Sequence, residues 1–93
     1  MKEIHLFPLV GSFAENKDIA REIRLEKIMP FIRNEDIMLN FDKIEGATQS
    51  FIHALISDVI RKYGPEIIDK FYFKNCNENI QKIITIVVDY MQE

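Results

Sequence analysis

The sequence is poor in the residues that bind metals or form cross-links. It has one cysteine, Cys76, and two histidines, His5 and His53. A single cysteine excludes a disulfide within the chain, and none of these residues shows the short spacings of a zinc site. The carboxylates follow no calcium-loop pattern. We therefore expect no metal site and no cofactor, and a lone thiol fits a reducing compartment.

Long apolar runs are also missing from the sequence. No run approaches the roughly 18 residues of a membrane-spanning helix, and residues 1–8 lack the apolar core of a signal peptide. The formal net charge of −3 argues against a general nucleic-acid binder, which usually carries a basic stripe. We expect a cytoplasmic protein that binds neither membranes nor nucleic acid.

Catalytic motifs are not found either. Gly46 stands alone, so no glycine-rich phosphate loop is present. Ser50 and His53 lie three positions apart on one predicted helix face, but no G-x-S-x-G elbow surrounds the serine. Cys76 precedes a predicted helix, where a thiolate would be stabilised, although packing is the commoner role of such a cysteine. The sequence therefore predicts a protein without enzymatic activity and without catalytic residues.

What the sequence does contain is enough apolar material for one core. The chain has 93 residues, of which 47% are hydrophobic. This length corresponds to one domain, residues 1–93. Basic residues are in excess between residues 17 and 33, and acidic residues between 34 and 47. Such an uneven distribution can orient a protein partner, although ordinary solvated surface would look the same.

Hydrophobic periodicity predicts six elements in the order β-α-β-α-β-α. Strands are expected at residues 3–10, 37–41 and 70–74, and helices at 17–32, 49–63 and from a cap at Asn75 to about 91. Pro8 indicates an edge strand or a bend, and Pro30 should end the regular part of its helix at about residue 28. This alternation predicts an α/β fold with a mostly parallel sheet.

Several helix ends carry clear capping signals. Asn16 or Asp18 is expected to cap the first helix, and Thr48 the second, by accepting from the N–H of Ser50 or Phe51. The pair Gly64-Pro65 should end that second helix, with one further turn over residues 66–69. Asn75 followed by Glu78 has the pattern of a capping box for the last helix.

The expected topology places a site at one edge of the sheet. Ligands and partners of parallel sheets usually bind at the carboxyl ends of the strands. Here these ends lead into residues 10–14, 42–50 and 75–77, which should converge. The middle segment passes from a buried strand into a helix whose N-terminal N–H groups would face a bound group, so we expect function there.

At this junction the sequence resembles a known family. Residues 40–56 resemble the strand–loop–helix motif of STAS domains, which include bacterial anti-sigma-factor antagonists and the cytoplasmic domains of sulfate transporters. The whole chain resembles the STAS-like domain family of unknown function, through the Ala20-x-x-x-Arg24 pattern and the Gln49-Ser50-Phe51 motif. The resemblance implies a STAS-like α/β fold with a small mixed or mostly parallel sheet. It also implies a bacterial regulatory module that docks a protein partner, such as an ATPase-type kinase or an anti-sigma factor.

The same resemblance excludes the usual regulatory switch. Gln49 stands where the antagonists carry a phosphorylated serine, with Thr48 at the preceding aspartate, Ser50 at the second serine and Phe51 at the following glycine. Phosphorylation would have to shift to Ser50 or Thr48.

Two functions follow as hypotheses. The first is a docking surface for a protein partner, made by Glu45, Gly46, Thr48, Gln49, Ser50 and His53. The alternative is a small-ligand or nucleotide sensor that uses the cleft at the strand ends.

Overall fold

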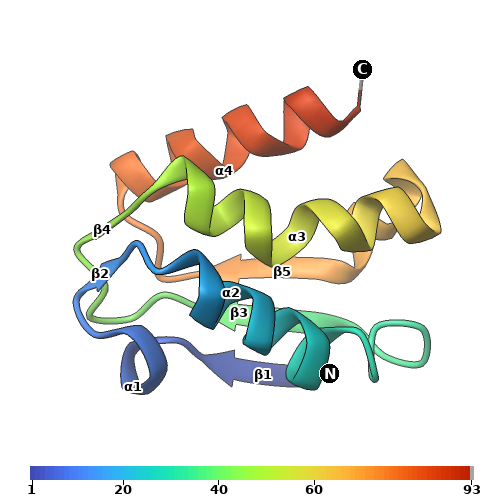
Figure 1. Ribbon diagram of the computed structural model, residues 1–93, viewed down its shortest axis with the longest axis horizontal. Helices are drawn as coiled ribbons and strands as arrows, with labels where there is room; N and C mark the ends of the chain where they lie inside the picture. The colour runs from blue at the N-terminus through green and yellow to red at the C-terminus, as the bar shows by residue number, and fades with distance from the viewer. Residues whose placement is uncertain (93) are drawn as a thin grey trace.

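A parallel three-stranded sheet forms the base of the molecule (Figure 1). The computed structural model describes residues 1–92. The strands are β1 (Lys2–His5), β3 (Ile37–Asn40) and β5 (Phe71–Lys74), and β3 lies between the other two. Both strand pairs are parallel, with Ile4 opposite Leu39 and Leu39 opposite Phe73. The predicted order and the parallel sheet are thus confirmed.

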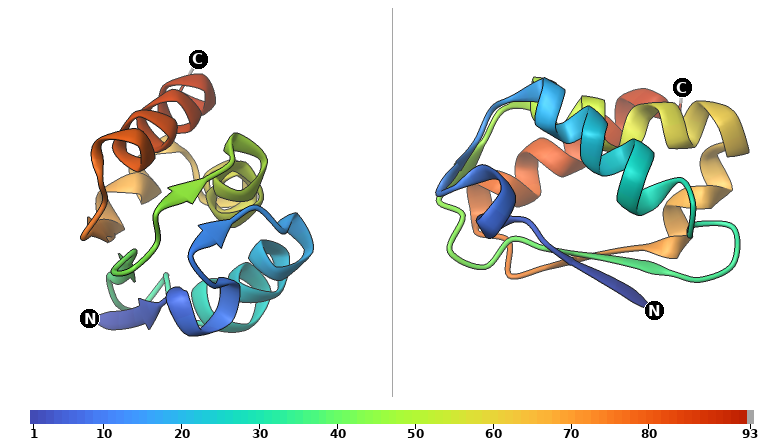
Figure 2. Two further views of the ribbon diagram at one scale, coloured as in Figure 1. Left: turned by 90° about the vertical axis from the view of Figure 1, so that its left-hand side faces the viewer. Right: turned by 60° about the horizontal axis from the view of Figure 1, so that its bottom comes forward.

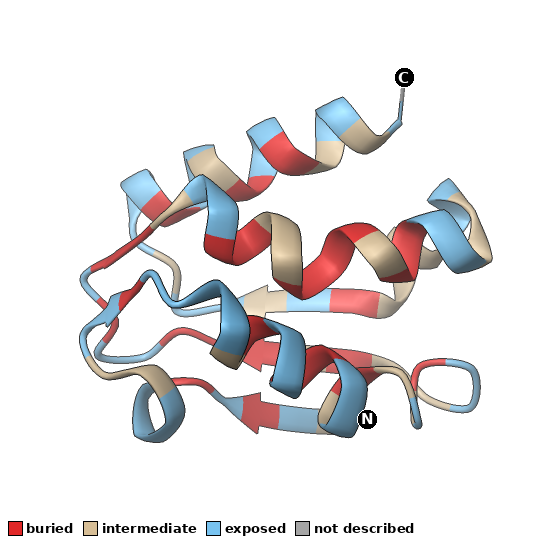
Figure 3. Cartoon of the chain, viewed as in Figure 1, coloured by how far each residue is buried: buried red, intermediate tan, exposed pale blue. Residues whose placement is uncertain are grey.

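Three helices form a layer on one side of this sheet (Figure 2). They are α2 (Lys17–Ile23), α3 (Gln49–Tyr63) and α4 (Glu78–Met91). The helix α3 lies between α2 and α4 (Figure 1). It is therefore covered on two sides by helices and below by the sheet, and buried stretches recur along it in Figure 3.

The core follows from this central position of α3. Six of its apolar residues recur at helical spacing and are at most 3% exposed: Phe51, Ile52, Leu55, Ile56, Val59 and Ile60. The inward residues of α4 are buried or half-buried in the same cluster, as the periodicity predicts. In the central strand β3, Ile37 and Leu39 are fully buried. One continuous apolar cluster thus joins the sheet to all three helices.

The first strand is shorter than predicted. It ends at His5, and residues Phe7–Val10 form a short helix, α1, instead of continuing the strand. The carbonyl of Leu6 accepts from the N–H groups of Leu9 and Val10. Pro8 lies in the first turn of α1, where its missing N–H costs nothing because that group has no partner inside the helix.

A second, two-stranded parallel sheet was not predicted. It pairs β2 (Phe13–Ala14) with β4 (Gly46–Ala47), directly before α2 and α3. A Cβ atom on Gly46 would lie 2.7 Å from Cε2 of Phe13. The solitary glycine is therefore explained by the close approach of this ring, and β2–β4 fixes the starts of α2 and α3 relative to each other.

The first long helix ends its regular part earlier than predicted. The α-helix ends at Ile23, and Arg24–Ile28 form a π-helical turn, η1. The N–H of Met29 donates to the carbonyl of Arg24, five residues back, at 2.8 Å. Periodicity does not distinguish such a turn from an α-helix. Of the two candidate caps, Asn16 is the one used, and it accepts from the N–H groups of Asp18 and Ile19.

The last two helix ends are partly as predicted. Gly64 follows α3 with φ +91° and precedes η2 (Pro65–Lys70), a 3-10 helix longer than the single turn expected. The cap of α4 is Asn77 rather than Asn75, because Asn77 is extended and its side chain accepts from the N–H of Ile80. Asn75 has φ +60°, whereas a cap residue needs an extended backbone.

Candidate functional site

The side chain of Asn40, the last residue of β3, joins β1 to the loops that follow β3 and β5. This residue is 6% exposed. Its Nδ2 donates to Glu3 Oε2 at 3.0 Å, and its Oδ1 accepts from the N–H of Asp42 at 2.9 Å and from Nδ2 of Asn75 at 3.0 Å. Asn40 thus links all three strands. Sequence reasoning did not select it, although an asparagine in a run of buried apolar residues is an available signal, because a buried amide needs partners.

Further contacts hold the middle loop in place. The N–H of Glu45 donates to the carbonyl of Ser12 at 2.7 Å, and Nδ2 of Asn77 donates to the carbonyl of Glu45 at 2.8 Å. The N–H of Thr48 donates to the carbonyl of Ala14 at 2.9 Å. The backbone of the loop before α3 is therefore fixed from both sides, by the backbone of residues 12–14 and by the side chain of Asn77.

The hollow at the strand ends is small. It measures about 150 Å³ and is lined by His5, Phe7, Pro8, Asn40, Asp42 and Lys43. Ligand pockets are typically about 300–1,000 Å³. Nothing in this hollow therefore favours a nucleotide over the docking of a protein.

The start of α3 presents polar side chains on a capped helix end. Oγ1 of Thr48 accepts from the N–H of Phe51 at 3.1 Å, so the predicted cap is formed. Glu45, Gln49 and Ser50 are exposed, whereas Thr48 is half-buried. Four of the six residues predicted for docking thus form one polar segment.

The other two predicted residues are placed differently. Gly46 is buried, and the Phe13 ring lies against it. His53 is half-buried, and its Nδ1 lies 3.3 Å from Oγ of the buried Ser57. The imidazole is therefore hydrogen-bonded to a serine one turn further along α3, and not to Ser50, which precedes it by one turn.

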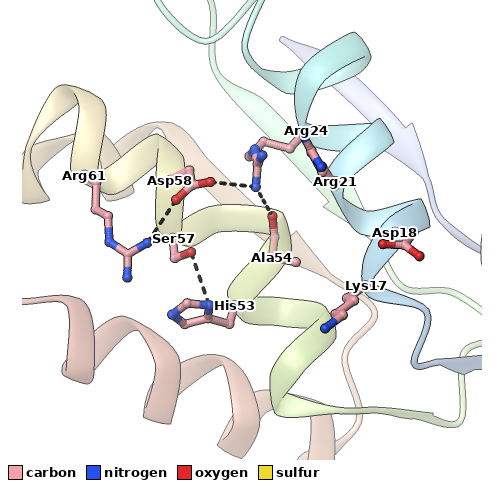
Figure 4. Close-up of a pocket in the computed structure, with 9 residues that line it drawn as sticks. All are labelled: Lys17, Asp18, Arg21, Arg24, His53, Ala54, Ser57, Asp58 and Arg61. Atoms are coloured by element: carbon pink, nitrogen blue, oxygen red, sulfur yellow. Dashed lines mark hydrogen bonds and ion pairs between the residues drawn. The ribbon is translucent and has the colours of Figure 1, made fainter.

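A basic groove lies between α2 and α3, and sequence reasoning missed it. This α2–α3 groove has a volume of about 420 Å³ (Figure 4). Its lining contains Lys17, Asp18, Arg21, Arg24, His53, Ala54, Ser57, Asp58 and Arg61. The sequence shows the basic excess of residues 17–33, but the cluster becomes visible only when α3 packs against α2 and adds Asp58 and Arg61.

Arg24 is the buried member of this groove. It is 9% exposed, and its Nη1 donates to the carbonyl of Ala54 at 2.8 Å and to Oδ2 of Asp58 at 3.0 Å. The other carboxylate oxygen of Asp58 accepts from Nη1 of Arg61 at 3.0 Å. A signal was present in the sequence, because Arg24 interrupts an otherwise apolar helix face near Ala20 and Ile28.

Cys76 is not poised for nucleophilic chemistry. The side chain is half-buried, and burial raises the pKa of its thiol to about 11. Its Sγ lies 3.9 Å from the carbonyl of Lys74. The uncharged thiol is therefore the form present near neutral pH, in agreement with a packing role rather than a reactive one.

Within residues 1–92, no three side chains of His, Cys, Asp or Glu come together as a metal site. In the same range, every helix falls short of the length and apolar character needed to cross a membrane.

Comparison with known proteins gives one match. A family model described as a STAS-like domain of unknown function matches residues 20–81. No curated protein and no solved structure matches the chain. The matched range includes Arg24, the whole of α3 and the strands β3 and β5.

Proposed function

Because the chain belongs to the family of STAS-like domains of unknown function, we propose that it is a non-enzymatic regulatory module that docks a protein partner. The docking surface is the loop and helix start at residues 45–53. The partner is of the kind that the likeness to anti-sigma-factor antagonists implies, an ATPase-type kinase or an anti-sigma factor.

One observation carries this proposal: an exposed polar segment stands on a rigid base. Gln49 and Ser50 point their side chains to solvent from the first turn of α3. The cap at Thr48 and the β2–β4 pair fix the backbone beneath them. A surface held in place before binding loses less conformational freedom on binding, which favours recognition of a partner by these side chains.

Of the two hydroxyl groups, that of Ser50 is better supported as a phosphorylation site than that of Thr48. The hydroxyl of Thr48 is occupied by the cap of α3, so a phosphate there would break a contact that holds the helix start. Ser50 is exposed in the first helical turn, where a negative charge is stabilised by the helix dipole. A phospho-switch in this chain would therefore use Ser50.

The proposal is tested by co-purification from the native host with three tagged forms. These are the wild type, Gln49→Arg, and the matched control Gln92→Arg, which adds the same charge at an exposed position after α4. We expect the wild type and Gln92→Arg to recover the same protein, and Gln49→Arg to lose it. All three should unfold at the same temperature.

Two outcomes would contradict the proposal. One is that no protein is recovered specifically with the wild type. The other is that Gln49→Arg and Ser50→Glu both keep the partner at wild-type yield, which would place the contact elsewhere.

A further inference from the structure

The α2–α3 groove gathers more positive charge than the chain as a whole would suggest. Four cationic side chains line it, Lys17, Arg21, Arg24 and Arg61, against the carboxylates of Asp18 and Asp58. Two positive charges therefore remain, in a protein whose formal net charge is −3. A concave surface lined by one sign of charge concentrates ligands of the opposite sign.

The two carboxylates do not neutralise this excess of positive charge. Asp58 is shared by Arg24 and Arg61, at 3.0 Å from each guanidinium. Asp18 forms no ion pair with a cation among the described residues, and the ammonium group of Lys17 points toward α3 (Figure 4). Lys17 and Arg21 are exposed and, among the residues that the structure describes, are the cations of the groove that form no ion pair.

Part of the cluster is held in position before any ligand arrives. The contacts of Arg24 with Ala54 and Asp58 fix its guanidinium at the floor of the groove. Asp58 in turn holds Arg61. Because these side chains are already ordered, an anion placed between them would cost less conformational entropy than one bound by free surface cations.

We propose that the α2–α3 groove binds a small phosphate-bearing anion by its phosphate groups. Guanidinium groups match the oxygens of a phosphate through paired hydrogen bonds. The volume of about 420 Å³ falls in the range of small-molecule sites, about 300–1,000 Å³. The lining contains no Phe, Tyr or Trp side chain, so the phosphates rather than a base provide the recognition.

The groove continues to the start of α3. A second hollow, lined by Lys17, Gln49, Ser50, His53 and Ala54, shares three of its residues with the groove. A bound anion would therefore lie beside the docking segment. The inference does not rest on the proposed function, however, because it concerns the cations of α2 and α3 and is tested without a partner.

The test measures binding of sodium phosphate, pyrophosphate and ATP by isothermal titration calorimetry. Adenosine and sodium chloride at equal ionic strength serve as reference solutes. The groove variant is Lys17→Gln/Arg21→Gln, and the matched control is Arg33→Gln/Lys82→Gln, which removes the same charge at exposed positions outside the groove. Thermal unfolding of both variants checks that they fold.

We expect pyrophosphate to bind more tightly than phosphate, since it can reach more of the cations. The groove variant should weaken binding about tenfold or more, because charge-assisted hydrogen bonds are lost, while the control keeps wild-type affinity. ATP should bind about as tightly as pyrophosphate, because the phosphates provide the recognition, and much tighter binding of ATP would contradict recognition by the phosphates alone.

The proposal is overturned by any of three results. These are binding of adenosine as tight as that of ATP, equal responses to chloride and pyrophosphate, and equal affinity in the groove variant and the wild type. In the wild type, 15N-labelled amides between residues 17 and 24 and between 50 and 61 should shift with pyrophosphate. Shifts confined to the strand ends would also contradict it.

Discussion

At the scale of single residues, the most unusual contacts in the structure are those of Arg24. It is a buried cation that joins two helices through the carbonyl of Ala54 and the carboxylate of Asp58. We expect Arg24→Ala to lower the free energy of unfolding by about 2–4 kcal/mol, because the packing of its stem and the hydrogen bonds to a charged group are lost together. Urea denaturation measures this loss.

Arg61 provides the control for this prediction. It binds the same Asp58 but is exposed, so Arg61→Ala should cost less than about 1 kcal/mol. Similar losses in the two variants would show that burial adds nothing to the Arg24 contact.

Cys76 gives a second prediction, one that depends on pH. Burial raises the pKa of its thiol from 9.0 to about 11, so the folded state holds the proton over a wider range of pH. At pH 8 the thiolate, which is the reactive form, should be about 100-fold rarer in the folded protein than in the unfolded chain. Alkylation by iodoacetamide should therefore be slow at pH 8 and accelerate as the pH rises toward 11.

The measurement compares native protein with protein unfolded in urea, by mass spectrometry over time. Equal rates at pH 8 would mean that the thiol is not protected by burial.

At the scale of the elements, the β2–β4 pair fixes the starts of α2 and α3. In Gly46→Ala, the new methyl group would meet the ring of Phe13 at 2.7 Å. Phe13 is 51% exposed, so its ring can move away, and we expect a loss of only about 1 kcal/mol. Phe13→Ala should make the same glycine substitution nearly neutral.

Thermal unfolding of the two single variants and the double variant measures this coupling. An undiminished cost of Gly46→Ala in the Phe13→Ala background would locate the constraint in the backbone instead of the ring.

The elements that could be predicted are those with local signals. The helix α3 begins and ends where the sequence predicted, at Gln49 and Tyr63, because the Thr48 cap and the Gly64-Pro65 stop act within one turn. The β2–β4 pair depends on contacts more than thirty residues apart in sequence, and Pro8 fits a bend and a first helical turn equally well. The local sequence of these segments is therefore compatible with more than one structure.

At the scale of the whole molecule, the candidate site likewise has a part that the sequence could predict and a part that it could not. The convergence of the loops and the exposed Gln49 and Ser50 follow from the order of the elements and the start of one helix. The α2–α3 groove depends on which faces of two helices turn toward each other, and that is decided by the core beneath them. Packing, which no single segment encodes, therefore places Lys17 and Arg61 in one cavity.

The same packing predicts which parts of the molecule unfold locally. Nearly every apolar residue of α3 is buried, and β3 is hydrogen-bonded on both sides, whereas α1 and η2 contain no buried residue. Amides of α3 and β3 should therefore exchange with solvent only through global unfolding, and those of α1 and η2 through local openings. Native-state hydrogen exchange in low urea distinguishes global from local opening. The exchange rates of the α3 and β3 amides should depend on urea as steeply as global unfolding does, and those of α1 and η2 should not. If amides of β3 exchanged as fast as those of α1, the sheet rather than α3 would be the less stable part of the core.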